Sequence, residues 1–254
     1  MEYFIVADVH GFYNELESAL KDKGWTDAEN QCFVSLGDLC DRGKDTIKVL
    51  QFVNSLPNER KILIRGNHED LMQAAIARGC FLMHDIHNGT VRTAEDIAKY
   101  EGIALKKEKL NEDDDREILQ AVASSNLWNT YLNSTVDFAE VKNNIFVHGW
   151  IPCKPGTYIK DPNWRSPKAR WEKARWINGM LAWKNGSRIK GKTIWCGHWH
   201  TSWGHAYLHN DGDEFPDNGG TAHFSPFIDD GIVAMDGMVA FSHKLNCKVI
   251  EVEK

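Results

Sequence analysis

Disulfide pairs, long apolar runs and an excess of positive charge are all missing from this sequence. Its six cysteines form no Cys-x-x-Cys pair and mostly lie in apolar segments, so we expect free thiols in a reducing compartment. No apolar run approaches the roughly 20 residues that span a membrane, and no signal-like segment precedes the first predicted strand. A net charge of −6 argues against a nucleic-acid partner. We therefore expect a cytoplasmic protein with no membrane partner.

The chain is long enough for one large domain. Its 254 residues are 42% hydrophobic, which supports a substantial core. It has no internal repeat and no linker rich in Pro, Gly or Ser. We expect a single domain over residues 1–254, with a polar, helical surface lobe at about 80–134.

Strand and helix patterns alternate in the first third of the chain. The apolar runs are Tyr3–Ala7, Cys32–Leu36 and Lys61–Ile64. Between them, helical patterns cover Phe12–Leu20 and Asp45–Val53, and another begins at His68 and ends before Gly79. This alternation predicts a parallel sheet with right-handed crossovers.

Strand patterns return after Thr135. The predicted strands are Val136–Val141, Asn144–Val147, Thr193–Cys196, Phe224–Phe227, Ile232–Met235, Val239–Ser242 and Cys247–Val252, with one helix expected over Ser166–Ala182. A second, mixed sheet packed on the first gives an α/β fold, an α/β/β/α sandwich of two mixed sheets with flanking helices.

Five predicted strands run directly into residues that can bind metals. These are Asp8-Val9-His10, Gly37-Asp38-Leu39-Cys40-Asp41-Arg42-Gly43, Gly66-Asn67-His68-Glu69, His148-Gly149 and Gly197-His198-Trp199-His200. Carboxylate, amide and imidazole donors suit Mn, Fe or Zn better than metals that prefer thiolates. Because α/β sheets build their sites at the carboxyl ends of strands, we expect these residues to converge.

In type and order these motifs resemble the calcineurin-like metallophosphoesterase superfamily, and in particular its phosphoprotein phosphatase branch of bacterial and phage-type serine/threonine phosphatases. The resemblance implies the four-layer fold and two divalent metal ions, Mn first, with Fe or Zn as alternatives. One ion would be held by Asp8, His10, Asp38 and His200, and the other by Asp38, Asn67, His148 and His198. The resemblance is thin at 80–140 and 206–222, where substrate preference would be set.

The resemblance also implies roles beyond metal binding. His68 would protonate the leaving oxygen, with Asp41 holding its ring in the correct tautomer. Arg42 would offer a forked donor to phosphate oxygens. A second arginine would bind phosphate as well; Arg175 is our choice, and spacing does not separate it from Arg170.

The most direct expectation is a metal-dependent phosphatase, a phosphomonoesterase in which a metal-bridged water attacks a phosphoprotein or a small phosphoester. One alternative is a symmetrical dinucleoside-polyphosphate hydrolase, a family that tends to carry Ala where Asp41 stands and Asp where Glu69 stands. His200 also departs from the phosphoprotein phosphatases, which usually keep only the first histidine of Gly-His-x-His.

Two further functions are possible alternatives. A phosphodiesterase on nucleotides or nucleic acid is suggested by the Trp and Arg residues interleaved in 166–182, since such residues can stack bases and contact phosphates. An amphipathic helix with buried tryptophans explains the same pattern. A scaffold without turnover is the non-enzymatic alternative.

Three other stretches are interpreted as structural. Gly186–Thr193 has the spelling of a P-loop, but a helix is predicted before it and a strand after it, the reverse of a P-loop. The acidic run Glu112–Asp115 is expected to begin a solvated helix. The loop at 210–220 resembles a calcium loop but has Ala222 where the required Glu would stand.

Overall fold

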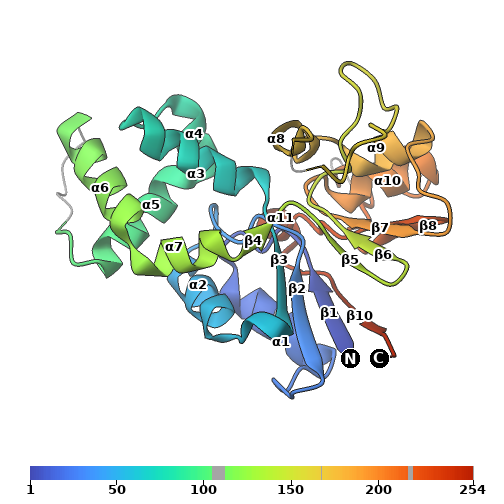
Figure 1. The fold of residues 1–254 in the computed structure, drawn as a ribbon, viewed down its shortest axis with the longest axis horizontal. Helices are drawn as coiled ribbons and strands as arrows, with labels where there is room; N and C mark the ends of the chain where they lie inside the picture. The colour runs from blue at the N-terminus through green and yellow to red at the C-terminus, as the bar shows by residue number, and fades with distance from the viewer. Residues whose placement is uncertain (105–111, 167, 217–219, 254) are drawn as a thin grey trace.

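Two five-stranded sheets form the centre of the protein, as the computed structural model shows for residues 1–104, 112–166, 168–216 and 220–253 (Figure 1). The strand order is β10-β1-β2-β3-β4 in the first sheet and β5-β6-β7-β9-β8 in the second. Both sheets mix parallel and antiparallel pairs.

The first sheet is built around the predicted alternation of strands and helices. Its strands are β1 (Glu2–Val6), β2 (Gln31–Ser35), β3 (Lys61–Ile64), β4 (Thr135–Val136) and β10 (Cys247–Glu251). Helices α1 (Tyr13–Asp22) and α2 (Thr46–Ser55) connect the first three strands, with a short 3-10 turn at Asn58–Arg60. Strands β1 to β4 run parallel, and β10 pairs antiparallel with β1.

The second sheet comes from the second half of the chain. Its strands are β5 (Ala139–Val141), β6 (Asn144–Phe146), β7 (Thr193–Cys196), β8 (Phe227–Asp229) and β9 (Ile232–Ala234). Helix α10 (Thr201–Leu208) follows β7. The predicted strand Val136–Val141 is divided between the two sheets, because β4 closes the first sheet and β5 opens the second.

Three apolar clusters define four layers. The cluster between the two sheets includes Ile5, Val34, Phe146 and Trp195. A second cluster lies between the first sheet and its helices, and a third between the second sheet and its helices. The α/β/β/α sandwich of two mixed sheets is thereby confirmed.

The helical lobe packs on the outer layer of the first sheet. It follows α3 (Asn67–Arg78) and consists of α4 (Met83–Asn88), α5 (Thr90–Tyr100), α6 (Glu112–Ser124) and α7 (Asn126–Asn133). In Figure 1 these helices lie on the opposite side of the first sheet from the second sheet. Their buried side chains, such as Ile97, Val122 and Trp128, belong to the same cluster as Phe33 of β2.

Two predicted elements are wrong, and the strand expected over Phe224–Phe227 is shifted to Phe227–Asp229. The helix expected over Ser166–Ala182 is two short helices, α8 (Trp171–Ala174) and α9 (Gly179–Lys184), separated by a turn. The strand expected at Val239–Ser242 is the short helix α11, flanked by residues with left-handed backbone. A turn is needed there because β9 and β10 belong to different sheets.

The P-loop-like stretch and the acidic run lie where the sequence predicted them. The P-loop spelling at Gly186–Thr193 follows helix α9 and runs into strand β7, which is the predicted reversed order. Helix α6 begins within the acidic run, at Glu112. Within the described residues, no helix has the length and apolar character needed to cross a membrane.

Candidate metal centre

Asp38 lies at the centre of the residues that follow the strands. Its Oδ2 atom is 3.3 Å from Nε2 of His148, 3.8 Å from Nε2 of His68 and 4.0 Å from Nε2 of His10. The side chain is buried, and it reaches these histidines from the turn after β2. One carboxylate therefore faces imidazoles that follow β1, β3 and β6.

Two groups of donor atoms share Asp38. In one, the donor atoms of Asp38, His148 and His198 all lie within 4.8 Å of one another; in the other, Asp38 is joined by His10 and His68 within the same limit. Asn67 adjoins the first group, since its Oδ1 is 2.8 Å from Nε2 of His148. The structure thus brings together predicted residues from both sheets.

Asp8 ties the end of β1 to the end of β7. Both of its carboxylate oxygens accept from the backbone N–H of His198 at 3.0 Å. The approach requires a glycine at position 197, because a Cβ there would lie 2.1 Å from Oδ2 of Asp8. The Gly-His spelling therefore has a steric cause.

His200 takes a different position from the other predicted ligands. Its Nε2 is 2.8 Å from Oε1 of Glu214, and its ring lies against those of Trp199 and Phe215. It belongs to neither donor group found among the described residues. Its role as a metal ligand stays a prediction.

His68 and Asp41 form a buried pair beside Asp38. Nδ1 of His68 is 2.7 Å from Oδ2 of Asp41, and its Nε2 is 3.4 Å from Nη2 of Arg42. The lobe supports this pair: the Thr90 hydroxyl donates to Oδ2 of Asp41 at 2.8 Å, and Thr93 Oγ1 accepts from the Asp41 backbone N–H at 3.0 Å. Both threonines lie on α5 and were missed in the sequence, where nothing marks them.

Glu69 connects the turn after β2 to the turn after β3. Its carboxylate accepts from the backbone N–H groups of Gly66 at 2.7 Å and Leu39 at 3.3 Å. The hydroxyl of Tyr131 on α7 donates to the same carboxylate at 2.7 Å. A fully buried glutamate thus links the turns after β2 and β3 to the lobe.

The backbone of the site is strained. Left-handed φ angles, which are uncommon for residues other than glycine, occur at six site residues: Asp8, His10, Asp38, Asp41, Arg42 and His198. Such conformations persist where the surrounding structure enforces them, and they concentrate at functional sites.

Asp236 was missed by the sequence analysis. It follows strand β9, is buried, and accepts from the backbone N–H of Met238 at 2.7 Å. Burial, followed by the charge of Asp236, raises the pKa of Asp8 well above its usual value. Applying the strand-end rule to the predicted strand Ile232–Met235 would have found this residue.

Comparison with known proteins identifies the family. A family model described as calcineurin-like phosphoesterase matches residues 1–220. The chain belongs to the calcineurin-like phosphoesterase family. Phosphoester cleavage is the chemistry that the description of this family names.

The curated relatives of this phosphoesterase match only part of it. The symmetrical bis(5'-nucleosyl)-tetraphosphatase of Psychromonas ingrahamii is 39% identical over 79 residues, which is 31% of this chain and 28% of that protein. The same enzyme of Erwinia tasmaniensis is 37% identical over an equal length and with equal coverage. The chain thus matches less than a third of the length of these relatives.

Solved structures support the fold. A cold-active protein tyrosine phosphatase covers 98% of this chain and 73% of its own, with a TM-score of 0.54 and 14% identity. A protein provisionally described as a diadenosine tetraphosphatase has the same TM-score and identity, and the match covers 98% of this chain and 89% of that one. At such low identity the likeness concerns the fold alone.

The electrostatics of the phosphoesterase site fit divalent cations. Burial raises the pKa of Asp8 and of Asp236, whereas burial and the charge of His148 lower the pKa of His198 to about 3. Burial alone would raise the pKa of Asp38, but the charges of the surrounding histidines, led by His148, hold it well below its usual value. Buried carboxylates with imidazole and amide donors around them are a donor set suited to such ions.

Arg175 is engaged elsewhere. Its Nη1 donates to Oδ2 of Asp70 at 2.6 Å, and its Nη2 donates to Oδ1 of Asp137. The arginine is buried, and both terminal nitrogens of its guanidinium group are paired with carboxylates. This position does not favour the predicted contact with phosphate. Arg170, the alternative, is exposed and lines a pocket with Cys153 and Tyr158.

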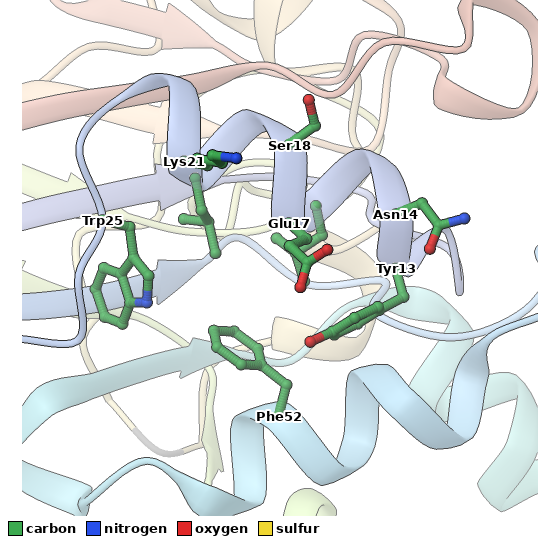
Figure 2. Close-up of a pocket in the computed structure, with 9 residues that line it drawn as sticks. Tyr13, Asn14, Glu17, Ser18, Lys21, Trp25 and Phe52 are labelled. Carbon is green, nitrogen blue, oxygen red and sulfur yellow. The ribbon is translucent and has the colours of Figure 1, made fainter.

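A cavity between α1 and α2 is separate from this chemistry. It has a volume of about 620 Å³, and Tyr13, Glu17, Lys21, Trp25 and Phe52 line it (Figure 2). None of the metal-donating residues lines this cavity. The cavity therefore lies apart from the candidate metal centre.

Proposed function

We propose that the chain is a phosphomonoesterase that uses two divalent metal ions, with a phosphoprotein or a small phosphoester as its substrate. The observation that carries this proposal is the buried pair of His68 and Asp41 beside Asp38, with Nε2 of His68 3.8 Å from Oδ2 of Asp38. A proton donor beside a carboxylate shared by two donor groups suits the cleavage of a phosphate ester.

The ligand sets would be built on the two donor groups, with Asp8 added to the group that contains His10, and with His68 left free to act as the acid. Asp8, His10 and Asp38 would hold one ion, and Asp38, Asn67, His148 and His198 the other, with His200 joining the first if it leaves Glu214. When bound, two such ions supply positive charge to the phosphate oxygens and lower the pKa of a water. We favour manganese because the donors are oxygens and imidazoles.

The remaining residues would act on the substrate directly. His68 would give the proton on Nε2 to the leaving oxygen, and Asp41 would keep the other ring nitrogen protonated. Although burial lowers the pKa of His68, the charges of Asp38 and Asp41 outweigh it and raise that pKa. Arg42, 3.4 Å from the same ring, would donate to the phosphate oxygens.

The presence of His68 as a proton donor favours phosphate esters of alcohols over phosphoanhydrides as substrates. An alkoxide leaving group is strongly basic and gains most from a positioned acid, whereas a phosphate leaving group is weakly basic and gains little. The support that Asp41 receives from Thr90 and Thr93 points the same way. We also propose that the enzyme acts in the cytoplasm, where its free cysteines would stay reduced.

The second candidate is a symmetrical dinucleoside-polyphosphate hydrolase. It is favoured by curated relatives with that activity in their names, which are 33–39% identical over 69 to 84 residues. Such an enzyme would use the same metal-binding residues and depend less on His68, since its leaving group is a nucleoside polyphosphate.

A substrate panel distinguishes the two. The metal-free protein, prepared with a chelator, would be assayed with and without Mn²⁺ on a phosphoserine peptide, p-nitrophenyl phosphate, bis-p-nitrophenyl phosphate and diadenosine tetraphosphate. The proposal expects Mn²⁺-dependent turnover with higher kcat/KM on the two monoesters. A clear preference for diadenosine tetraphosphate would establish the second candidate, and a preference for the diester would overturn both.

A further inference from the structure

Trp176 is exposed beside the metal centre. It follows helix α8 and is 49% exposed, whereas the other nine tryptophans are buried or half-buried. Its ring centroid lies 5.7 Å from that of His198, edge to face. A large aromatic surface thus faces solvent next to a predicted metal ligand. An exposed apolar group of this kind does not stabilise the fold by burial, and such groups often mark binding sites.

The turn that carries Trp176 is fixed from several directions. Arg175 is bound by Asp70 of α3 and by Asp137, which lies in the connection from β4 to β5. Gly149 lies so close to this turn that a Cβ on it would be 2.6 Å from the carbonyl oxygen of Arg175.

This rigidity separates Trp176 from an ordinary surface side chain. A fixed aromatic ring loses little conformational freedom when a ligand covers it. A tryptophan that served only to support His198 would be expected to have a buried ring. Trp128 and Trp150, elsewhere in the protein, are examples of such buried tryptophans. The indole instead contacts the ring of His198, extends from a fixed turn and leaves about half of its surface open.

We propose that Trp176 forms an aromatic subsite that binds a planar ring of the substrate. This inference rests on the proposed function, because it places the phosphate at the residues around His198. A ring on Trp176 must then be joined to that phosphate through few bonds. Two sources fit this chemistry: an aryl ring on the ester oxygen, and the base of a nucleotide, since any such ring can stack on an indole.

The test compares substrates with and without a ring. Trp176→Leu would be measured in Mn²⁺ on p-nitrophenyl phosphate, diadenosine tetraphosphate, a phosphoserine peptide without aromatic residues, and inorganic tripolyphosphate. We expect kcat/KM to fall by about tenfold on the ring-bearing substrate that the site accepts, as for the loss of one stacked base. The two ringless substrates should change by less than about twofold.

Two further variants serve as controls. Trp176→Phe retains an aromatic face and should recover most of the loss. Tyr100→Leu removes an equally exposed aromatic from the end of α5 and should have no effect on any substrate. Metal content of the purified variants should equal that of the wild type, because the indole ring is not a ligand.

The outcomes decide the proposal and its source. A loss confined to p-nitrophenyl phosphate assigns the subsite to aryl rings, and a loss confined to diadenosine tetraphosphate assigns it to nucleobases. An equal loss on ringless substrates, or no loss on either ring-bearing one, overturns the proposal.

A binding measurement separates this inference from the proposed function. Calorimetry on the Mn²⁺-loaded protein would compare adenosine monophosphate and phenyl phosphonate with inorganic phosphate, for wild type and Trp176→Leu. We expect tighter binding of at least one ring-bearing ligand, lost in the variant, even if no phosphomonoester is turned over. Equal affinity of wild type and variant for both ring-bearing ligands would contradict the subsite.

Discussion

Nδ1 of His68 lies 2.7 Å from Oδ2 of Asp41, which leaves Nε2 as the ring nitrogen that faces Asp38 and Arg42. His68→Asn should lower kcat by about 10²–10⁴-fold on an alkyl phosphate, because the leaving oxygen loses its proton donor. Metal content should stay at the wild-type value. Steady-state kinetics and metal analysis measure the two effects.

The size of that loss should follow the leaving group. Nitrophenolate leaves without much help from an acid, so the effect of His68→Asn should be smaller on p-nitrophenyl phosphate than on a phosphoserine peptide. An equal loss over leaving groups of widely different basicity would assign His68 another role.

Thr90 should matter through Asp41. Thr90→Val removes the hydroxyl that donates to Oδ2 of Asp41 at 2.8 Å, and we expect kcat on an alkyl phosphate to fall by about tenfold, the worth of one bond to a charged group. Thr90→Ser should restore activity. If Thr90→Val loses as much on p-nitrophenyl phosphate as on the alkyl ester, the threonine supports the fold and not the acid.

Asp38 should be required for both metal ions. Asp38→Asn removes the negative charge shared by the two donor groups, so turnover should be abolished and Mn²⁺ binding weakened at both positions. Calorimetric titration of the metal-free variant measures this. A variant that retained two tightly bound ions and near-normal activity would contradict the assignment.

Replacing Arg42 should affect catalysis, whereas replacing Arg175 should affect stability. Arg42→Ala should cost about 1.5–3 kcal/mol in kcat/KM on an aryl monoester, since a guanidinium donates charge-assisted bonds to a dianion. The same change should cost less on the matching diester, which has one negative charge fewer.

Arg175→Ala should instead lower stability. Removing the guanidinium leaves Asp70 and Asp137 without their shared partner, and we expect a loss of roughly 1–3 kcal/mol in the free energy of unfolding, because both carboxylates are partly exposed. Urea denaturation measures it. A monoester-specific loss of kcat/KM at unchanged stability would restore the predicted phosphate contact.

The parts of the fold that depend on local pattern were predictable. Lys61–Ile64 and Thr193–Cys196 are strands with the expected bounds, because short apolar runs between polar turns have few other solutions. The site followed from the same pattern. Asp38 and His148 each stand within three residues of a strand end, and parallel strands place such ends at one edge of a sheet.

What depends on distant partners was not predictable. The turn after Ala174 breaks an otherwise helical pattern, and Arg175 there pairs with Asp70, 105 residues away. The threonine that supports Asp41 is 49 residues distant from it and stands in a segment without any motif. Composition and periodicity carry no information about such contacts.

The pairing of β10 with β1 has a consequence for synthesis of the protein. Glu2 pairs with Glu251, so one edge of β1 has no neighbour until residues 247–251 have left the ribosome. During that time β1 offers unpaired backbone groups, the type of edge that recruits foreign strands. Newly made chains should therefore be most prone to aggregate just before β10 emerges, and a holding chaperone would act in that interval.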